Sequence, residues 1–263
     1  DLTGDGRPEI LTHWQGAWGY VAPNWEKVAA PWKFHRIGAP GDWPQFYHGQ
    51  GAGDLNGDGA IDVVINHGWL EAPGSVGDGS QGVDESAEWK FHPYQFGERG
   101  GAQMLVFDVD GDQDNDVVTS LDAHGWGLAW FENRRDEQTG AVAFERHKFM
   151  GSREEQPQYG VAFSQPHAMA SGDIDGDGLT DVVVGKRRWA HGPRGDVEPN
   201  APAVVYWFRL ERDGEGARFQ SHLIDDHSGV GLQIAVDDVN GDGRVDILTA
   251  SKLGTFLFLA ESR

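Results

Sequence analysis

The stretch Asp173-Ile-Asp-Gly-Asp-Gly-Leu-Thr-Asp181, followed directly by Val182-Val183-Val184, decides the fold. Oxygen-bearing side chains stand at positions 1, 3, 5 and 9 of this loop, and glycines stand at positions 4 and 6. A hard cation such as Ca²⁺ takes about six to eight oxygen ligands, and glycine permits the sharp turns that bring them together. A helix-flanked calcium loop has a glutamate at position 12, whereas this chain has Val184 in a β-branched run. The stretch therefore predicts a calcium loop that leads into a β-strand.

The loop recurs along the whole chain. Good copies occupy residues 54–62, 108–116 and 238–246, and a weaker copy occupies residues 1–9. The copies start 53, 54, 65 and 65 residues apart, a spacing typical of a repeat architecture. We expect four to five Ca²⁺ sites. Their predicted ligands are Asp1, Thr3, Asp5, Glu9, Asp54, Asn56, Asp58, Asp62, Asp108, Asp110, Asp112, Asp116, Asp173, Asp175, Asp177, Asp181, Asp238, Asn240, Asp242 and Asp246.

Composition excludes several classes of function. The 263-residue chain has a formal net charge of −21, which argues against binding to nucleic acid or to anionic membranes. It has no cysteine, and therefore no disulfide framework, thiolate zinc site or cysteine nucleophile. No apolar run is long enough to insert into a membrane. Calcium loops of this kind fill mainly outside the cytoplasm, so we expect an extracytoplasmic setting: secreted, periplasmic or on the cell surface.

Each repeat reads as four short strands. The first precedes the calcium loop, the second follows it, the third is aromatic, and the fourth carries a histidine. The recurring fourth-strand segments are 32–35, 89–92, 144–147 and 219–222. Four short strands in each repeat of about 40–65 residues predict the blade of an all-β propeller, in which radial repetition leaves only short sheet edges.

On these motifs the chain resembles the FG-GAP or VCBS repeat family, which includes the integrin α-subunit propeller and many bacterial secreted proteins. The resemblance rests on Asp-x-[Asp/Asn]-Gly-Asp-Gly-x-x-Asp with its following apolar strand. The last two repeats also look like propeller modules of large secreted planctomycete-type proteins. The resemblance implies calcium-loop blades and leaves the function open, because the family is functionally diverse.

The number of blades has two interpretations. Five repeats are visible, with boundaries near 1–45, 46–99, 100–160, 161–228 and 229–263, and we read 1–263 as one propeller domain. The first repeat lacks a first strand and the last lacks a fourth. The alternative is that the chain forms the C-terminal part of a seven-bladed ring and belongs to a larger chain or assembly.

The candidate binding residues lie on the face opposite the predicted calcium loops. In a propeller, the second-to-third connections and the starts of the innermost strands lie together on that face. Function usually resides on such loops, which a rigid scaffold positions. The candidate ligand-binding residues there are His13, Trp14, His48, His67, Trp69, His124, Trp126, His167, Lys186, Arg187 and His191.

The histidines divide into two groups. His35, His92, His147 and His222 share one position in the fourth strand, so a structural role in each blade is the better interpretation. His13, His67 and His124, which recur near the end of the second strand, have two interpretations. They either repeat a hydrogen bond to a neighbouring turn, or belong to a ring of imidazoles at the channel mouth that holds a second metal or acts in acid–base chemistry. The tryptophans likewise either stack on sugars or pack between blades.

Two functions compete. The first is a calcium-stabilised module that binds a carbohydrate or a protein partner through this face, with Lys186, Arg187 and Arg188 available to an anionic group such as a uronate. The second is a carbohydrate-active lyase or dehydratase. There His67, His124 or His167 would abstract the proton α to a carbonyl, and a cation or Arg187 would stabilise the enolate. A purely architectural array is a third possibility, and the sequence leaves open whether the chain is catalytic.

Overall fold

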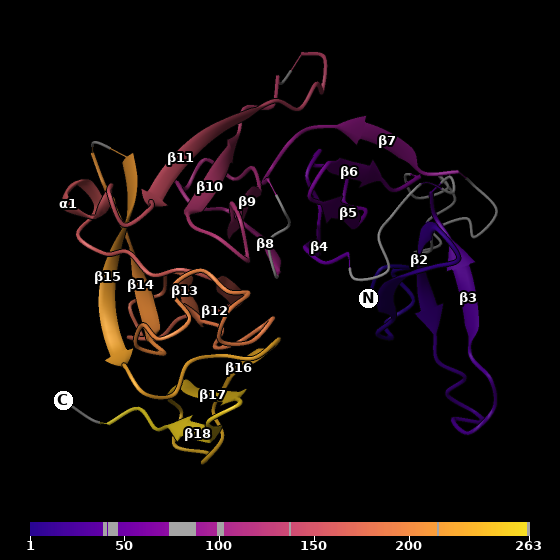
Figure 1. Cartoon of the computed structure of the whole chain (residues 1–263). Coiled ribbons are helices and arrows are strands. Elements are labelled where there is room, and N and C mark those ends of the chain that lie inside the picture. Colours follow the sequence, from indigo (N-terminus) through magenta and orange to yellow (C-terminus); the bar gives the residue numbers. More distant parts are fainter. Residues whose placement is uncertain are drawn as a thin grey trace.

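The protein is an all-β propeller of five blades that follow one another in chain order (Figure 1). The computed structural model describes residues 1–38, 41, 47–73, 88–98, 103–136, 138–214 and 216–261. Three blades are four-stranded antiparallel sheets in sequential order, and the first and fifth have three strands each within the described residues. In Figure 1 these two blades stand at the two ends of the arc.

The strands agree with the expected four-strand repeat. The first blade contains β1 (Ile10–Trp14), β2 (Ala17–Ala22) and β3 (Lys33–Arg36); the second contains β4 (Gln50–Gly53), β5 (Asp62–Ile65), β6 (Gly68–Glu71) and β7 (Lys90–Pro93). The third contains β8 (Met104–Phe107), β9 (Asp116–Ser120), β10 (Leu128–Asn133) and β11 (Phe144–Met150). The fourth contains β12 (Pro166–Gly172), β13 (Asp181–Lys186), β14 (Val205–Asp213) and β15 (Gly216–Asp225), and the fifth contains β16 (Ile234–Asp237), β17 (Asp246–Ser251) and β18 (Gly254–Phe258).

Helix is nearly absent. The described residues contain a single four-residue helix, α1 (Gln156–Tyr159), and it has no buried residue. They contain no helix with the length and hydropathy required to cross a membrane.

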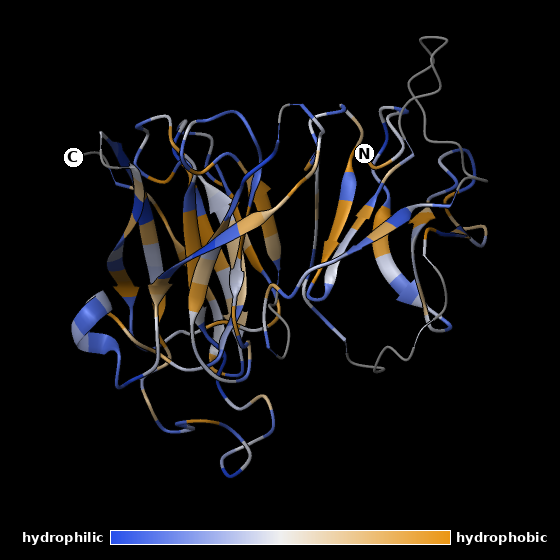
Figure 2. Ribbon diagram, turned by 90° about the horizontal axis from the view of Figure 1, so that it is seen from above, coloured by the Kyte–Doolittle hydropathy of each residue, from blue (hydrophilic) through white to orange (hydrophobic). Residues whose placement is uncertain are grey.

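The hydrophobic core lies between adjacent blades. Side chains of a strand point alternately to its two faces. In β5, Val63 and Ile65 therefore pack toward the first blade, whereas Val64 packs toward the third. The apolar runs of β5, β9 and β13, each directly after an acidic loop, are thus buried on both sides, and Figure 2 shows apolar residues along the strands of the sheets. Further clusters join the third blade to the fourth and the fourth to the fifth.

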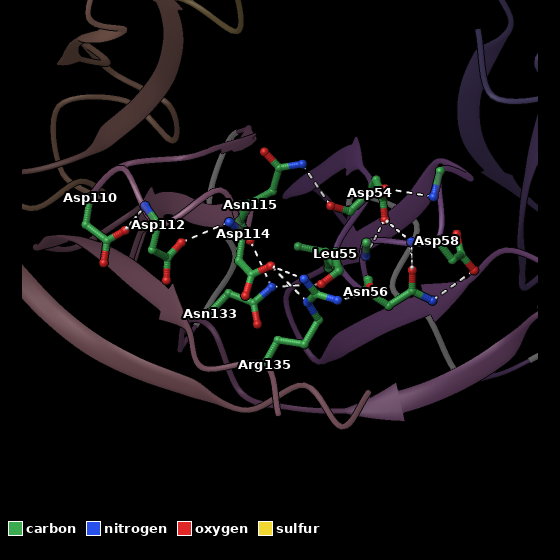
Figure 3. A network of polar contacts seen from close by, with 12 residues as sticks. Asp54, Leu55, Asn56, Asp58, Asp110, Asp112, Asp114, Asn115, Asn133 and Arg135 are labelled. Carbon is green, nitrogen blue, oxygen red and sulfur yellow. Dashed lines mark hydrogen bonds and ion pairs between the residues drawn. The ribbon is translucent and has the colours of Figure 1, made fainter. Parts of the chain in front are cut away.

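Hydrogen bonds also join neighbouring blades. Asn133, at the end of β10, donates from Nδ2 to the Leu55 carbonyl oxygen of the second blade (2.8 Å), and Asn115 donates to the Asp54 carbonyl oxygen (2.8 Å). Figure 3 shows these contacts beside Arg135, which pairs with Asp114 (2.7 Å). The acidic loop of one blade is therefore fixed to the blade that follows it.

Candidate functional site

The acidic loops close one end of each blade. They connect β4 to β5, β8 to β9, β12 to β13 and β16 to β17, so all of them lie at the same end of the propeller. The position-1 aspartate caps the turn: Asp173 Oδ1 accepts from the backbone N–H groups of Gly176 (2.8 Å) and Asp177 (3.0 Å), and Asp173 Oδ2 accepts from that of Gly178 (3.0 Å).

The position-9 aspartate is buried and links two parts of its blade through hydrogen bonds, a role that the sequence analysis did not assign to it. Asp181 accepts from the backbone N–H of Ile174 in its own loop (3.0 Å) and from that of Leu210 in β14 (2.8 Å). The same pair of contacts occurs in three other blades, at Asp62, Asp116 and Asp246. Each of these carboxylates therefore ties the loop to the third strand of its blade or to a residue just after that strand.

The loops also gather carboxylates closely enough to fit a cation. One ligand oxygen from each of Asp108, Asp110 and Asp116 lies within 4.8 Å of the other two. Burial, with the neighbouring carboxylates adding to it, raises the pKa of Asp116 to about 7. In the fourth blade, Asp175 Oδ1 is buried and has no hydrogen-bond partner, although Arg209 pairs with Asp175 Oδ2 (2.7 Å). Crowded, incompletely compensated oxygens are the donor set that Ca²⁺ prefers.

The opposite end holds a pocket of about 760 Å³, which we call the histidine pocket. It collects residues from all five blades, because the starts of the inner strands and the second-to-third connections converge there. Its lining residues are Thr12, His13, Tyr47, His48, Gly49, Gln50, Gln103, His124, His167, Arg187, Ala190, His191, Leu232 and Gln233. None of these residues is an aspartate or a glutamate, although the chain has 42 of them.

Four imidazoles lie in contact within this pocket. His48 Nε2 and His124 Nε2 are 3.0 Å apart, and the His167 ring lies 4.8 Å from that of His48, between centroids. The His191 ring lies 4.8 Å from that of His124. Arg187 donates from Nη1 to His167 Nε2 (2.9 Å). Four imidazoles and one guanidinium therefore lie together at one point of an acidic protein, and His191 Nδ1 is also 3.3 Å from Asp196 Oδ1.

The electrostatics keep two of these rings neutral. Burial, followed by the charges of Arg187, His48 and His124, lowers the pKa of His167 to about 3. Burial, followed by His48, His191 and Arg187, lowers that of His124 to about 4. A buried imidazole next to other cationic groups resists taking up a proton. Arg187 therefore carries the positive charge there at neutral pH.

Several predicted residues lie elsewhere. His67 is outside the histidine pocket, where its Nδ1 contacts Gln95 Oε1 (3.1 Å). Trp14 is exposed, and Trp69 is buried between the second and third blades. Trp126 lies beneath the Arg153 guanidinium, 5.4 Å from the ring centroid. The structure thus brings His13, His48, His124, His167, Arg187 and His191 together, but not these four side chains.

Lys186 is also absent from the pocket lining, because its side chain points into the protein. It is almost fully buried and donates to Ser164 Oγ and to the carbonyl oxygen of Val197 (3.3 Å). Burial lowers its pKa to about 8. Lys186 holds the 187–202 segment against residue 164, so its role in the structure is to support the pocket wall.

The fourth-strand histidines have a structural contact in common. Each stacks on the aromatic ring opposite it in the third strand: His35 on Tyr20, His92 on Trp69, His147 on Trp130 and His222 on Trp207. Two of them also bind a glutamate, His92 to Glu71 (2.5 Å) and His147 to Glu132 (2.7 Å). This agrees with the interpretation of this histidine position as structural.

Tyr47 is a pocket residue that the sequence analysis missed. Its ring contacts those of His13, Trp18 and His67, and burial raises its pKa to about 12. The sequence could have indicated Tyr47, because it directly precedes His48 at the start of an inner strand, on the face already assigned to binding.

The recurring acidic loops and the propeller fold agree with the protein family that part of the sequence matches. Residues 173–249, which span the fourth and fifth acidic loops, match the FG-GAP-like repeat. This segment of the five-bladed β-propeller is therefore an FG-GAP-like repeat. No curated protein matches it. The FG-GAP-type fold supports a binding module in general terms, and its blades carry the histidine pocket at the end opposite the acidic loops.

Proposed function

We propose that this FG-GAP-type propeller is an extracytoplasmic, calcium-stabilised binding module for a carbohydrate that carries a carboxylate. The observation behind the proposal is the composition of the histidine pocket: Arg187 and five histidines, with no acidic residue among the lining residues that the structure describes. In a chain with 42 acidic and 21 basic residues, such a lining favours an anionic ligand.

The size and the polar groups of the pocket suit a sugar. Its volume of about 760 Å³ lies within the range of about 300–1,000 Å³ that is usual for small-molecule sites. Tyr47 and Leu232 supply apolar surface, while Thr12 and Gln233 supply groups that can bond to hydroxyls. Arg187 is the group suited to the carboxylate, because a guanidinium matches its geometry.

Calcium would act at the other end of the molecule. The position-1, -3, -5 and -9 oxygens of each loop would hold the ion, which would offset the repulsion among their carboxylates. Its role would be structural, since a ligand that binds only the folded state stabilises that state. Loops of this class fill at the calcium concentrations found outside the cytoplasm, which supports the extracytoplasmic assignment.

The binding proposal is tested by calorimetric titration with matched acidic and neutral oligosaccharides. The protein should bind a uronate-containing oligosaccharide and bind its neutral glucose counterpart much more weakly. Arg187→Gln should weaken acidic-sugar binding by about 10–100-fold, because one charge-assisted hydrogen bond is lost.

The matched control is Arg188→Gln. Arg188 is the next residue, and its guanidinium lies over the Trp189 ring (4.6 Å to the centroid) outside the pocket lining. The Arg188→Gln variant should bind the acidic sugar as tightly as the unmodified protein does. Equal binding of both sugars, or equal losses in the two arginine variants, would contradict the proposal.

A lyase or dehydratase is the second candidate, favoured by the convergence of His124, His167 and Arg187 in one pocket. The pKa values of about 4 and 3 for the two histidines make them weak bases at neutral pH, so binding ranks first. Release of an unsaturated sugar during incubation with the acidic oligosaccharide would reverse that order.

A further inference from the structure

Three histidines from three different blades converge in the histidine pocket. His48 lies just before β4, His124 lies in the connection between β9 and β10, and His167 lies in β12. One ring nitrogen from each lies within 4.8 Å of the other two. Since 76 positions separate His48 from His124 in the sequence, only the propeller brings these rings together.

We propose that His48, His124 and His167 form a three-imidazole site for one transition-metal ion of the Zn²⁺ class. Zinc–nitrogen bonds of about 2.0–2.1 Å in a tetrahedron place the ligand nitrogens about 3.3–3.4 Å apart. The His48 and His124 Nε2 atoms, at 3.0 Å, are already near that separation.

The donor set selects the class of metal. Imidazole suits zinc, copper, nickel and cobalt, whereas calcium and magnesium require oxygen ligands. Within the described part of the chain the pocket lining has no carboxylate, and the sequence has no cysteine. This site is therefore chemically distinct from the acidic loops at the other end of the molecule.

Two buried nitrogens independently indicate a missing ligand. His124 Nδ1 and His167 Nδ1 are buried and have no hydrogen-bond partner, and the His167 side chain is almost fully buried. Buried polar atoms are rarely left unpaired in native proteins.

Three protein ligands leave a coordination position open toward the pocket. This is the arrangement of zinc sites that accept an exogenous ligand. Arg187 lies beside that position, 2.9 Å from His167 Nε2, and would have to turn from the ring toward an incoming anion. This last step rests on the proposed function, whereas the metal site itself does not.

The test uses the full chain without an affinity tag, kept in calcium and freed of transition metals with 1,10-phenanthroline. Titration with Co²⁺, followed by its visible absorption, should show one equivalent bound with the intense bands of a tetrahedral nitrogen site. Zn²⁺ should displace it. His124→Ala and His167→Gln should each weaken binding by more than about 10–100-fold, the usual cost of losing even a second-sphere partner.

The controls separate this site from surface histidines and from misfolding. His67→Ala and His227→Ala remove imidazoles outside the pocket lining and should leave the Co²⁺ titration unchanged. Circular dichroism must show that the pocket variants are folded; if His167→Gln is not, His124→Ala and His48→Ala decide. Absence of the cobalt bands, or equal binding by the pocket and control variants, overturns the proposal. Because sugar is absent, the result does not depend on whether the carbohydrate proposal is correct.

Discussion

Single residues show how one loop sequence is adapted in different blades. Four copies of the acidic loop have glycine at position 6, with φ between 82° and 89°, whereas the third blade has Gln113 there with φ 77°. A residue with a Cβ is strained in this left-handed region. The third-blade loop therefore contains strain that the other copies lack.

Gln113→Gly should raise the free energy of unfolding by about 1 kcal/mol, because the strain is removed. Urea denaturation measures the change. The reciprocal control is Gly178→Gln, at the same position of the fourth-blade loop, where a Cβ would meet no atom within 4 Å. It should lower the free energy by a similar amount, and a change of the opposite sign in either variant would contradict the argument.

At the scale of elements, the loop and the strand after it act as one unit. The position-9 aspartate ends the loop, begins the second strand and binds the third strand, as Asp181 does through Ile174 and Leu210. A cation held by the same loop would therefore stabilise the sheet, and not the turn alone.

Chelation of calcium should lower the melting temperature, and added Ca²⁺ should restore it. Mg²⁺ at equal concentration should restore it less, because Mg²⁺ demands a smaller and stricter coordination geometry. Differential scanning calorimetry measures both. Asp175→Asn keeps the shape of the side chain but removes a charge from the fourth-blade loop, so it should reduce the calcium-dependent part of the shift. A melting temperature independent of calcium would exclude structural calcium sites.

At the scale of the whole molecule, glutamine side chains at the starts of the inner strands form hydrogen bonds to other blades. Gln103 accepts from the Met169 backbone N–H of the fourth blade (2.8 Å) and donates to the Leu232 carbonyl oxygen of the fifth (3.0 Å). Gln50 similarly donates to the Leu11 carbonyl oxygen of the first blade (3.1 Å). These glutamines hold together the blades that form the histidine pocket.

Gln103→Leu should lower the free energy of unfolding by about 2 kcal/mol, because the buried Met169 N–H loses its partner. It should also speed amide exchange at the start of β12. Gln233→Leu, at the corresponding position before β16 and exposed, is the control and should change stability little. Equal effects of the two substitutions would contradict the bridging role.

Much of the fold could be predicted because its signals are local. The glycines, the alternating oxygens and the β-branched run of residues 173–184 specify a turn and a strand from neighbouring residues alone, and their recurrence predicts blades. The candidate site was predicted less completely. The shared face of His48, His124 and His167 followed from topology, but Lys186 and Trp69 follow the same pattern and point into the protein.

The sequence by itself determined the acidic loops, the four-strand repeat and the end of the propeller where the histidines gather. Tertiary structure alone decided which of those histidines meet, that Lys186 is buried beside Ser164, and that Tyr47 joins the pocket. The physical reason is that loop and strand formation depend on residues within one repeat. The pocket instead depends on the angles between blades, which are set by side chains packed between the sheets of different repeats.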